Sequence, residues 1–261
     1  MVWRLLPTIS APMSLQMALD ELLFSIRKKE IQAPVLRFYV SSEPWISVGY
    51  SFRETTDLSK SDLIRRHPRV PVCRRMTGGG CVLHGRDLIF SLIARYAETG
   101  SVSWGNGACP SQPHKGTGTP AVSLCETKRQ GSQSPLFSVR ASYQKIHESV
   151  KTGLERCGLD PKFYDSKEKL PKGSDCFDFP VESDLSWKGQ KIAGGAQRRS
   201  DGVLLHHESV RVPPGVDRGE LIQALRRGFE TVFGVSIQSA DFDPEIYFQA
   251  ERIGGQRTDV G

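Results

Sequence analysis

The spacing of hydrophobic residues predicts a helix near the start of the chain and strands after it. Leu15, Leu19, Leu22 and Ile26 recur at intervals of three and four residues, which places them on one face of a helix over residues 14–28. The apolar segments that follow are short and rich in β-branched and aromatic residues, which is typical of strands. We therefore predict strands over residues 35–40, 45–50, 70–76, 81–84 and 88–94, with a polar helical segment at 57–66.

Helical spacing returns in the second half of the chain. Tyr143, Val150 and Leu154 share one face of a helix predicted from residue 142, and Gly158 is placed to end it. Beyond it we predict a Lys188-Gly189 turn between two short strands, a strand over 202–212, and a helix that Asp217 caps and Gly234 follows. Helices at the start, middle and end, with strands clustered between them, predict an α+β fold rather than regular βαβ alternation.

One segment lacks any hydrophobic period. Residues 101–135 are rich in Gly, Pro, Ser and Thr, and we interpret them as a flexible surface insertion. Most stretches of this kind are tolerated loops without a function of their own. The 261 residues are enough for one large domain with a substantial core, so we predict a single domain over residues 1–261.

Composition and charge narrow the class of protein. A hydrophobic content of 38% and a charged content of 25% exclude general disorder. Neither an apolar run of 18 residues nor a signal-peptide core is present, so we expect a cytoplasmic protein with no membrane partner. The net charge of +6 suits an acidic partner such as a carrier protein, a phosphate or a nucleic acid, and it equally suits a solvated surface. The six cysteines contain no CxxC pair and the histidines are scattered, so we expect reduced thiols and no metal site.

A run of three glycines follows the strand predicted at 70–76. Gly78, Gly79 and Gly80 allow the backbone to approach a ligand closely, and Arg74 and Arg75 just before them favour a carboxylate or phosphate. The run is neither a P-loop nor a GxGxxG dinucleotide motif. From these residues alone, a simple turn between two strands explains the pattern equally well.

Two further residues have chemical potential. Lys191 stands beside Ala193, Gly194 and other small residues, where it could reach a buried oxyanion, although a lone lysine in a hairpin usually lies at the surface. Cys176 precedes it by 15 positions, and a nearby cation would favour its nucleophilic thiolate. The ordinary alternative is a buried and inert cysteine.

Together these segments resemble a known family. RRMTGGGCVLH (74–84) is similar to the RRxSGGGxVxH signature of the lipoate–protein ligase and octanoyltransferase family, and KIAGGAQ (191–197) is similar to its lysine motif, K-[IV]-x-G-x-A. The resemblance covers nearly the whole chain, from Leu15 to the last predicted helix. It implies a biotin/lipoate–protein ligase-like catalytic domain, an α+β fold of mixed β-sheets flanked by helices.

The segment between Cys176 and Lys191 resembles one branch of this family. Its Cys-Phe pair, Asp184 and Gly-x-Lys are similar to the cysteine-dependent octanoyltransferases of Gram-positive type, and the Arg-Asn-Asp-like segment of ATP-dependent ligases is absent. The resemblance implies transfer of octanoyl from octanoyl-acyl carrier protein to the lysine of a lipoyl domain. Such domains occur in E2 subunits of 2-oxoacid dehydrogenases and in the glycine-cleavage H protein. Neither a cofactor, a metal nor a nucleic acid is implied.

The resemblance also implies roles for particular residues. Cys176 would be the nucleophile, and Lys191 would lower its pKa or stabilise the oxyanion. The substrate-binding residues would be Arg74, Arg75, Thr77, Gly78, Gly79, Gly80, His84, Gly194 and Ala196. The chain departs from the family pattern at Thr77, which replaces the commoner Ser, at Gly195, where Ser or Asn is usual, and at His207-Glu208, which replaces a His-Gly pair.

Three alternatives stay open from the sequence. An ATP- and Mg-dependent lipoate ligase would use Lys191 on an acyl-adenylate and leave Cys176 structural. A non-catalytic acyl-binding protein could retain the pocket alone. A relay of acyl groups between lipoyl domains shares the same family and a similar cysteine.

Overall fold

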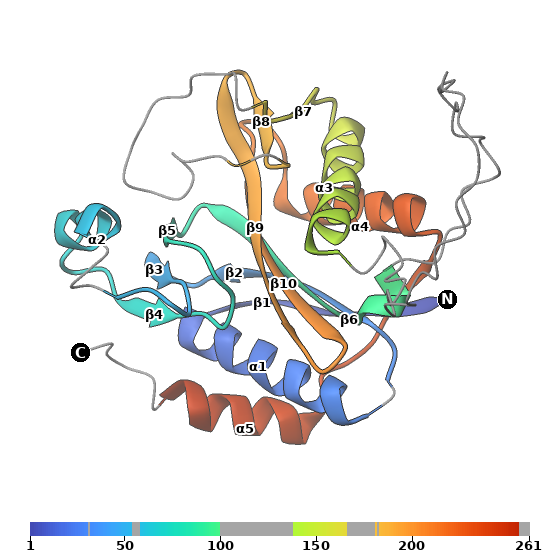
Figure 1. The fold of residues 1–261 in the computed structure, drawn as a ribbon, viewed down its shortest axis with the longest axis horizontal. Coiled ribbons are helices and arrows are strands. Elements are labelled where there is room, and N and C mark those ends of the chain that lie inside the picture. Colours follow the sequence, from blue (N-terminus) through green and yellow to red (C-terminus); the bar gives the residue numbers. More distant parts are fainter. Residues whose placement is uncertain (31, 54–57, 100–137, 166–180, 182, 256–261) are drawn as a thin grey trace, which may run out of the picture.

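The computed structural model describes residues 1–30, 32–53, 58–99, 138–165, 181 and 183–255. The predicted insertion at 101–135 and the predicted nucleophile Cys176 lie outside the described residues. The described strands form two sheets (Figure 1). The larger has the order β11-β1-β2-β6-β10-β9-β8-β7, and the smaller has the order β4-β3-β5.

The elements follow one another in this order: β1 (Val2–Ala11), α1 (Met13–Lys29), β2 (Val35–Ser41), β3 (Trp45–Val48), α2 (Leu58–Arg66), β4 (Val72–Arg74), β5 (Cys81–His84), β6 (Asp87–Arg95), the 3-10 helix η1 (Tyr96–Thr99), α3 (Val139–Arg156), β7 (Lys162–Phe163), β8 (Leu185–Trp187), β9 (Gln190–Ser200), β10 (Val203–Arg211), α4 (Arg218–Phe233), β11 (Ser236–Ser239) and α5 (Pro244–Gly255). β1 pairs in parallel with β2 and β11, and β3 with β4, whereas the other pairs are antiparallel. The predicted α+β fold with mixed sheets is therefore confirmed.

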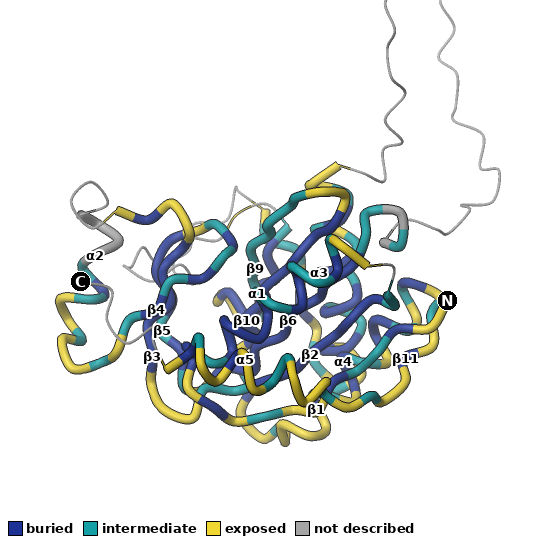
Figure 2. The backbone as a smooth tube through the Cα atoms, turned by 90° about the horizontal axis from the view of Figure 1, so that it is seen from below, coloured by how far each residue is buried: buried dark blue, intermediate teal, exposed yellow. Residues whose placement is uncertain are grey.

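Helices cover both faces of the large sheet. α3 and α4 pack on one face, and α1, with α5 behind it, packs on the other (Figure 1). Strand β6 shows the consequence, because Leu88 and Phe90 join the core beneath α3 and α4 while Ile89 and Ile93 face the other side. A strand covered on both faces is apolar throughout, which explains why 88–94 lacks the alternation of a half-exposed strand. Figure 2 shows the buried residues gathered in these central elements.

The helix ends follow the expected capping chemistry. The side chain of Asp217 accepts hydrogen bonds from the backbone N–H groups of Gly219 and Glu220, and Gly234 ends α4 in the left-handed conformation. Ser138 caps α3 in the same way through the N–H of Ala141. The predicted turn at Lys188-Gly189 also forms, with positive φ at both residues.

The small sheet positions the glycine run. β3 lies between β4 and β5, so the segment that joins β4 to β5 crosses the end of β3. There the N–H of Tyr50 donates to the carbonyl of Thr77 at 2.9 Å, and the N–H of Gly49 donates to that of Gly80 at 3.2 Å. A Cβ at Gly49 would lie 2.1 Å from the carbonyl oxygen of Gly79, so only glycine allows the two segments to meet.

β1, β11 and α5 are among the elements that the sequence pattern did not predict. β1 contains Pro7, which lacks an N–H, and its register with β2 shifts between Leu6 and Ile9. β11 is short and buries only Ile237, and α5 buries few residues because it packs on α1 from outside. Their weak patterns gave no signal above the surrounding polar sequence. None of the described helices combines the length and the apolar character needed to cross a bilayer.

Candidate functional site

A cavity of about 200 Å³ opens where the glycine run meets α1, β9 and β10. One wall is apolar and comes from Met13, Met17, Tyr39 and Ile89, which belong to one buried cluster. The other lining residues are Ser47, Arg75, Gly79, Val82, His84, Val181, Asp184, Lys191, Gly194, Gly195, Ala196, His207, Glu208 and Ser209. The fold thus brings both predicted motifs to one cavity.

Lys191 enters this cavity from β9 as part of a buried ion pair. Its Nζ lies 2.7 Å from Oδ2 of Asp184, and the two side chains are 8% and 1% exposed. Burial raises the pKa of Asp184, while the charge and hydrogen bond of Lys191 act to lower it. A cation in so little water interacts strongly with any anion that enters the cavity.

Gly194 makes room for this lysine. A Cβ at Gly194 would lie 2.1 Å from Cε and 2.4 Å from Nζ of Lys191, and 2.8 Å from Oδ1 of Asp184. The lysine side chain therefore folds back across the glycine three positions later on its own strand. The absence of a side chain at Gly194 therefore gives the lysine side chain a path to Asp184.

A tight turn presents Asp184 to Lys191. The N–H of Asp184 donates to the carbonyl of Val181 at 2.9 Å, and the N–H of Val181 donates back to Oδ2 of Asp184 at 2.7 Å. Between them Ser183 has φ of 90°, in the region that favours glycine. This turn is a conformation that its neighbours must hold in place.

The two arginines of the first motif fix backbone. Arg75, 7% exposed, donates from Nη2 to the carbonyl of Gly78 at 2.7 Å and from Nη1 to the carbonyl of Ser47 at 3.1 Å. Arg74 donates from Nη1 to the carbonyls of Gly49, Tyr50 and Phe52 at 2.9–3.1 Å. Their guanidinium groups thus hold the glycine run and the end of β3 in register.

His84 belongs to a second buried network on the cavity wall. Its Nδ1 lies 2.6 Å from Oδ2 of Asp87 and its Nε2 lies 2.8 Å from Oγ of Ser47. Ser209 of β10 also donates to Oδ2 of Asp87. Burial alone would raise the pKa of Asp87, but the charge and hydrogen bond of His84, with help from Ser209, lower it to about 2.

Thr77 is linked to α1 through His207. Its hydroxyl lies 3.1 Å from Nδ1 of His207, and Nε2 of His207 lies 3.0 Å from Oδ2 of Asp20 on α1. Asp20 also accepts hydrogen bonds from Arg37 and from the hydroxyl of Ser91. Burial alone would raise the pKa of Asp20, and the charge of Arg37 and the contacts of His207 outweigh it, lowering the pKa to about 2.

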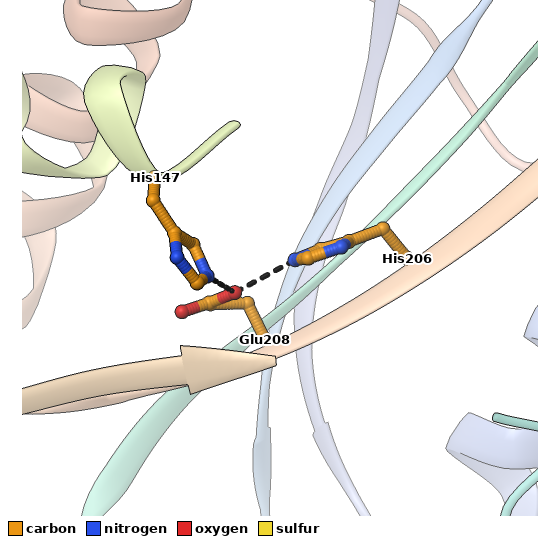
Figure 3. Close-up of side chains that lie close together, drawn as sticks. All are labelled: His147, His206 and Glu208. Carbon is orange, nitrogen blue, oxygen red and sulfur yellow. Dashed lines mark hydrogen bonds and ion pairs between the residues drawn. The ribbon is translucent and has the colours of Figure 1, made fainter. Parts of the chain in front are cut away.

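A further polar cluster joins α3 to β10, and Figure 3 shows His147 and His206 both directed at Glu208. Oε2 of Glu208 lies 2.9 Å from Nε2 of His147 on α3 and 2.7 Å from Nε2 of His206 on β10. All three side chains are fully buried. A Cβ at Gly195 would lie 2.2 Å from Oε2 of Glu208 and 2.6 Å from Nε2 of His206, so the departures at Gly195 and Glu208 go together.

The predicted site residues divide into three groups by their position. The first group lines the cavity: Arg75, Gly79, His84, Lys191, Gly194 and Ala196. The second group is absent from the lining: Arg74, Thr77, Gly78 and Gly80. The third is Cys176, which lies outside the described residues. His147, His206, Asp20 and Asp87 were not predicted as site residues from the sequence. A signal existed for His206, because it shares an otherwise apolar face of β10 with Glu208.

Comparisons with known proteins identify the family of the chain. The family model described as lipoyl protein ligase A/B catalytic domain matches residues 12–105. The octanoyltransferase LipM of Exiguobacterium sibiricum is 31% identical over 237 residues, which cover 88% of this chain and 72% of that protein. Octanoyltransferase LipM of Geobacillus kaustophilus is 31% identical over 216 residues, 80% of this chain and 65% of that protein. The chain therefore spans about two thirds to three quarters of the length of these relatives.

A solved structure shows the same fold. The putative lipoate protein ligase from T. acidophilum with bound lipoic acid superposes with a TM-score of 0.66. The comparison covers 98% of this chain and 95% of that one at 19% identity. This likeness supports the biotin/lipoate–protein ligase-like architecture predicted from the two motifs.

Proposed function

The chain belongs to the family of lipoyl protein ligase A/B catalytic domains, and we propose that it transfers an octanoyl group to the lysine of a lipoyl domain through a thioester on Cys176. The similarity to curated octanoyltransferases supports acyl transfer in protein lipoylation. The donor is octanoyl-acyl carrier protein, and the acceptors are lipoyl domains of 2-oxoacid dehydrogenase E2 subunits or the glycine-cleavage H protein.

The observation that carries this proposal is the buried pair of Lys191 and Asp184 at a cavity with an apolar wall. The wall of Met13, Met17 and Ile89 suits an eight-carbon acyl chain, because burying each methylene is favourable by about 0.8 kcal/mol. The ammonium of Lys191 suits the oxygen of the acyl carbonyl, which becomes an oxyanion in the transition state.

The chain length allows Cys176 to reach this cavity. Val181 lines the cavity and follows Cys176 by five positions, and five residues span at most about 17 Å. Cys73, a buried cysteine near the apolar wall, is a poor alternative because burial raises its pKa to about 12. We therefore assign the nucleophile to Cys176.

The proposed reaction has two steps, a thioester exchange followed by aminolysis. The thiolate of Cys176 attacks the carbonyl of the donor thioester, Lys191 stabilises the oxyanion, and the carrier leaves as its thiolate and takes up a proton. The acceptor lysine, as a free amine, then attacks the S-octanoyl carbonyl, Cys176 leaves as thiolate, and the new amide nitrogen releases a proton. Because the donor is already an activated thioester, the route needs neither ATP nor Mg²⁺.

Intact-mass measurement tests the proposal directly. The protein is incubated briefly with octanoyl-acyl carrier protein in the absence of ATP, next to the Cys176→Ala variant. We expect one octanoyl group on the unaltered protein, none on the variant, and discharge when apo lipoyl domain is added.

Other outcomes assign the alternatives. Modification of the acceptor only with free lipoate or octanoate, ATP and Mg²⁺ would establish an adenylating ligase. An octanoylated lipoyl domain that acylates Cys176 when the carrier protein does not would establish relay between lipoyl domains. Inactivity with every donor would leave an acyl-binding protein.

A further inference from the structure

The cluster of His147, His206 and Glu208 has the composition of a metal site. Its hydrogen bonds, however, require protons on the histidine nitrogens that face Glu208, where a metal ion would need lone pairs. Nε2 of Gln197 lies 3.2 Å from Nδ1 of His206, and Oε1 of Gln197 accepts from Nε of Arg199 at 3.2 Å. The arginine can only donate, so it holds the amide oxygen toward itself and the amide nitrogen toward His206. Nδ1 of His206 is then an acceptor, and its Nε2–H donates to Glu208.

This tautomer removes the lone pair that a metal ion would need. A metal at Nε2 of His206 requires the proton on Nδ1, which would face the N–H₂ group of Gln197. Reversing the amide would set that group against Arg199. The partners of His206 therefore oppose metal binding at its Nε2.

His147 carries protons on both nitrogens. Its Nδ1 contacts the carbonyl oxygen of Ser183, and its Nε2 lies 2.9 Å from Oε2 of Glu208. Both partners are acceptors, so both nitrogens must donate and the ring is an imidazolium. Burial lowers the pKa of His147, but the charge and hydrogen bond of Glu208, with Asp184 as a further anion, raise it overall.

Glu208 is the matching anion. Burial alone would raise the pKa of Glu208, yet the charge and hydrogen bond of His147 and the hydrogen bond of His206 bring it to about 2. Its other oxygen, Oε1, has no hydrogen-bond partner among the described residues. The ring of Tyr143 packs edge-on against both histidine rings, and its hydroxyl donates to the carbonyl of Gly195.

The imidazolium connects this cluster to the catalytic lysine. It binds the carbonyl of Ser183, whose φ of 90° is unfavourable for a residue with a side chain. The next residue is Asp184, the partner of Lys191. We propose that His147, kept as an imidazolium by Glu208, is a positioning residue that holds the Ser183 turn and thereby the Asp184–Lys191 pair. This inference rests on the proposed role of Lys191.

Two substitutions of one residue separate the two contacts of His147. The amide of His147→Asn places an N–H group where Nδ1 was and can retain the bond to Ser183, whereas that of His147→Gln replaces Nε2 and can retain only the bond to Glu208. We expect His147→Gln to lower kcat about tenfold or more, with KM for octanoyl-acyl carrier protein changed less than about twofold. His147→Asn should retain several times more activity than His147→Gln.

The control is Lys151→Ala, which removes an exposed ion pair on the same helix and should leave kcat unchanged. Thermal unfolding of all variants reports packing. Equal kcat for the two His147 variants, with loss that follows their stability, would reduce His147 to a packing residue and overturn the proposal.

The protonation state is read without any substrate, by ¹⁵N NMR of the histidine side chains. We expect His147 to remain doubly protonated at pH 7.5, and its pKa to fall in Glu208→Gln because burial then acts without a counter-charge. A neutral His147 at that pH, or one equivalent of zinc in the purified protein, would overturn the assignment. Failure of the unaltered protein to form octanoyl-enzyme would instead contradict the proposed function, because the NMR result does not depend on it.

Discussion

At the scale of single residues, the two glycines after Lys191 have different neighbours and therefore different meanings. Gly194 borders the flexible end of Lys191, whereas Gly195 borders the carboxylate of Glu208 and the backbone oxygen of His207. Neither has the positive φ that usually explains a glycine. Both positions are small because other groups occupy the space of a Cβ: the side chain of Lys191 at Gly194, and the carboxylate of Glu208 with the backbone oxygen of His207 at Gly195.

Gly194→Ala should lower activity without unfolding the protein. The new methyl group would displace Nζ of Lys191 from Asp184, and a flexible side chain can move at little cost. We expect octanoyl-enzyme formation to slow at least about tenfold, while the free energy of unfolding falls by less than the roughly 3–5 kcal/mol expected for removing one partner of a buried pair, because the ammonium is displaced but not deleted. Mass spectrometry of reactions stopped at successive times measures the rate of octanoyl-enzyme formation. Urea denaturation measures the free energy of unfolding. Gly255→Ala, which meets open space, is the control, and an unchanged rate in Gly194→Ala would show that the position of Nζ is unimportant.

At the scale of secondary structure elements, buried ion pairs join helices to the sheet. Asp20 on α1 contacts Arg37 on β2, and both side chains are at most 1% exposed. Asp20 also binds His207 on β10 and Ser91 on β6, so one carboxylate holds four elements together. A buried pair of this kind adds little net stability compared with apolar residues, but removing one partner strands the other charge.

Asp20→Asn should therefore destabilise the fold strongly. The guanidinium of Arg37 would stay buried without its counter-charge, and we expect a loss of about 3–5 kcal/mol in the free energy of unfolding, measured by urea denaturation. Asp62→Asn on α2 is the matched control, because Asp62 is 45% exposed beside Arg65 and Arg66. That change should cost less than about 1 kcal/mol. Similar losses for both variants would mean that the charge of Asp20 is not what holds α1.

Sequence periodicity predicted the elements that have one dominant face. α3 and α4 place apolar residues at helical spacing because each packs one side on the sheet. Both ends of α4 were predicted, whereas α3 begins at Val139, three residues before the predicted start. β1 and α5 were missed for different reasons: Pro7 breaks the alternation of the strand, and the helix packs mainly on α1 rather than on the sheet. An element that is buried mainly by another surface element therefore has only a weak hydrophobic periodicity in its own sequence.

Only those parts of the candidate site that belong to a sequence motif could be predicted. The glycine run and the lysine motif identified Arg75, Gly79, His84, Lys191 and Gly194, which all line one cavity. His147 was hidden because it occupies an ordinary helical position, and its partners, Ser183 in the turn before β8 and Glu208 on β10, are remote in sequence. Pairing between α3 and β10 arises from the tertiary fold, so no local spacing encodes it.

At the scale of the whole molecule, buried carboxylates couple stability to acid. Asp20, Asp87 and Glu208 each have a pKa lowered to about 2, while in the unfolded chain they titrate near pH 4. A lowered folded pKa stabilises the protein above the unfolded pKa, and this stability is lost as pH falls through the folded value. Each group contributes about 2–3 kcal/mol at neutral pH. Asp184, whose pKa burial raises, opposes this loss in part.

Stability should therefore fall steeply between about pH 4.5 and pH 2. Because a domain is typically stable by only about 5–15 kcal/mol, the loss of three such contributions is enough to unfold it near pH 2. Urea denaturation at pH 6, 5, 4 and 3 measures the slope, which reports the protons that the unfolded chain takes up in excess. Asp87→Asn should be less stable at pH 6 and show a shallower slope, since one of the three carboxylates no longer titrates. A free energy of unfolding that stays constant from pH 5 to pH 3 would mean that these carboxylates are not selectively stabilised as anions, and that the polar networks around the cavity do not hold the charges assigned to them.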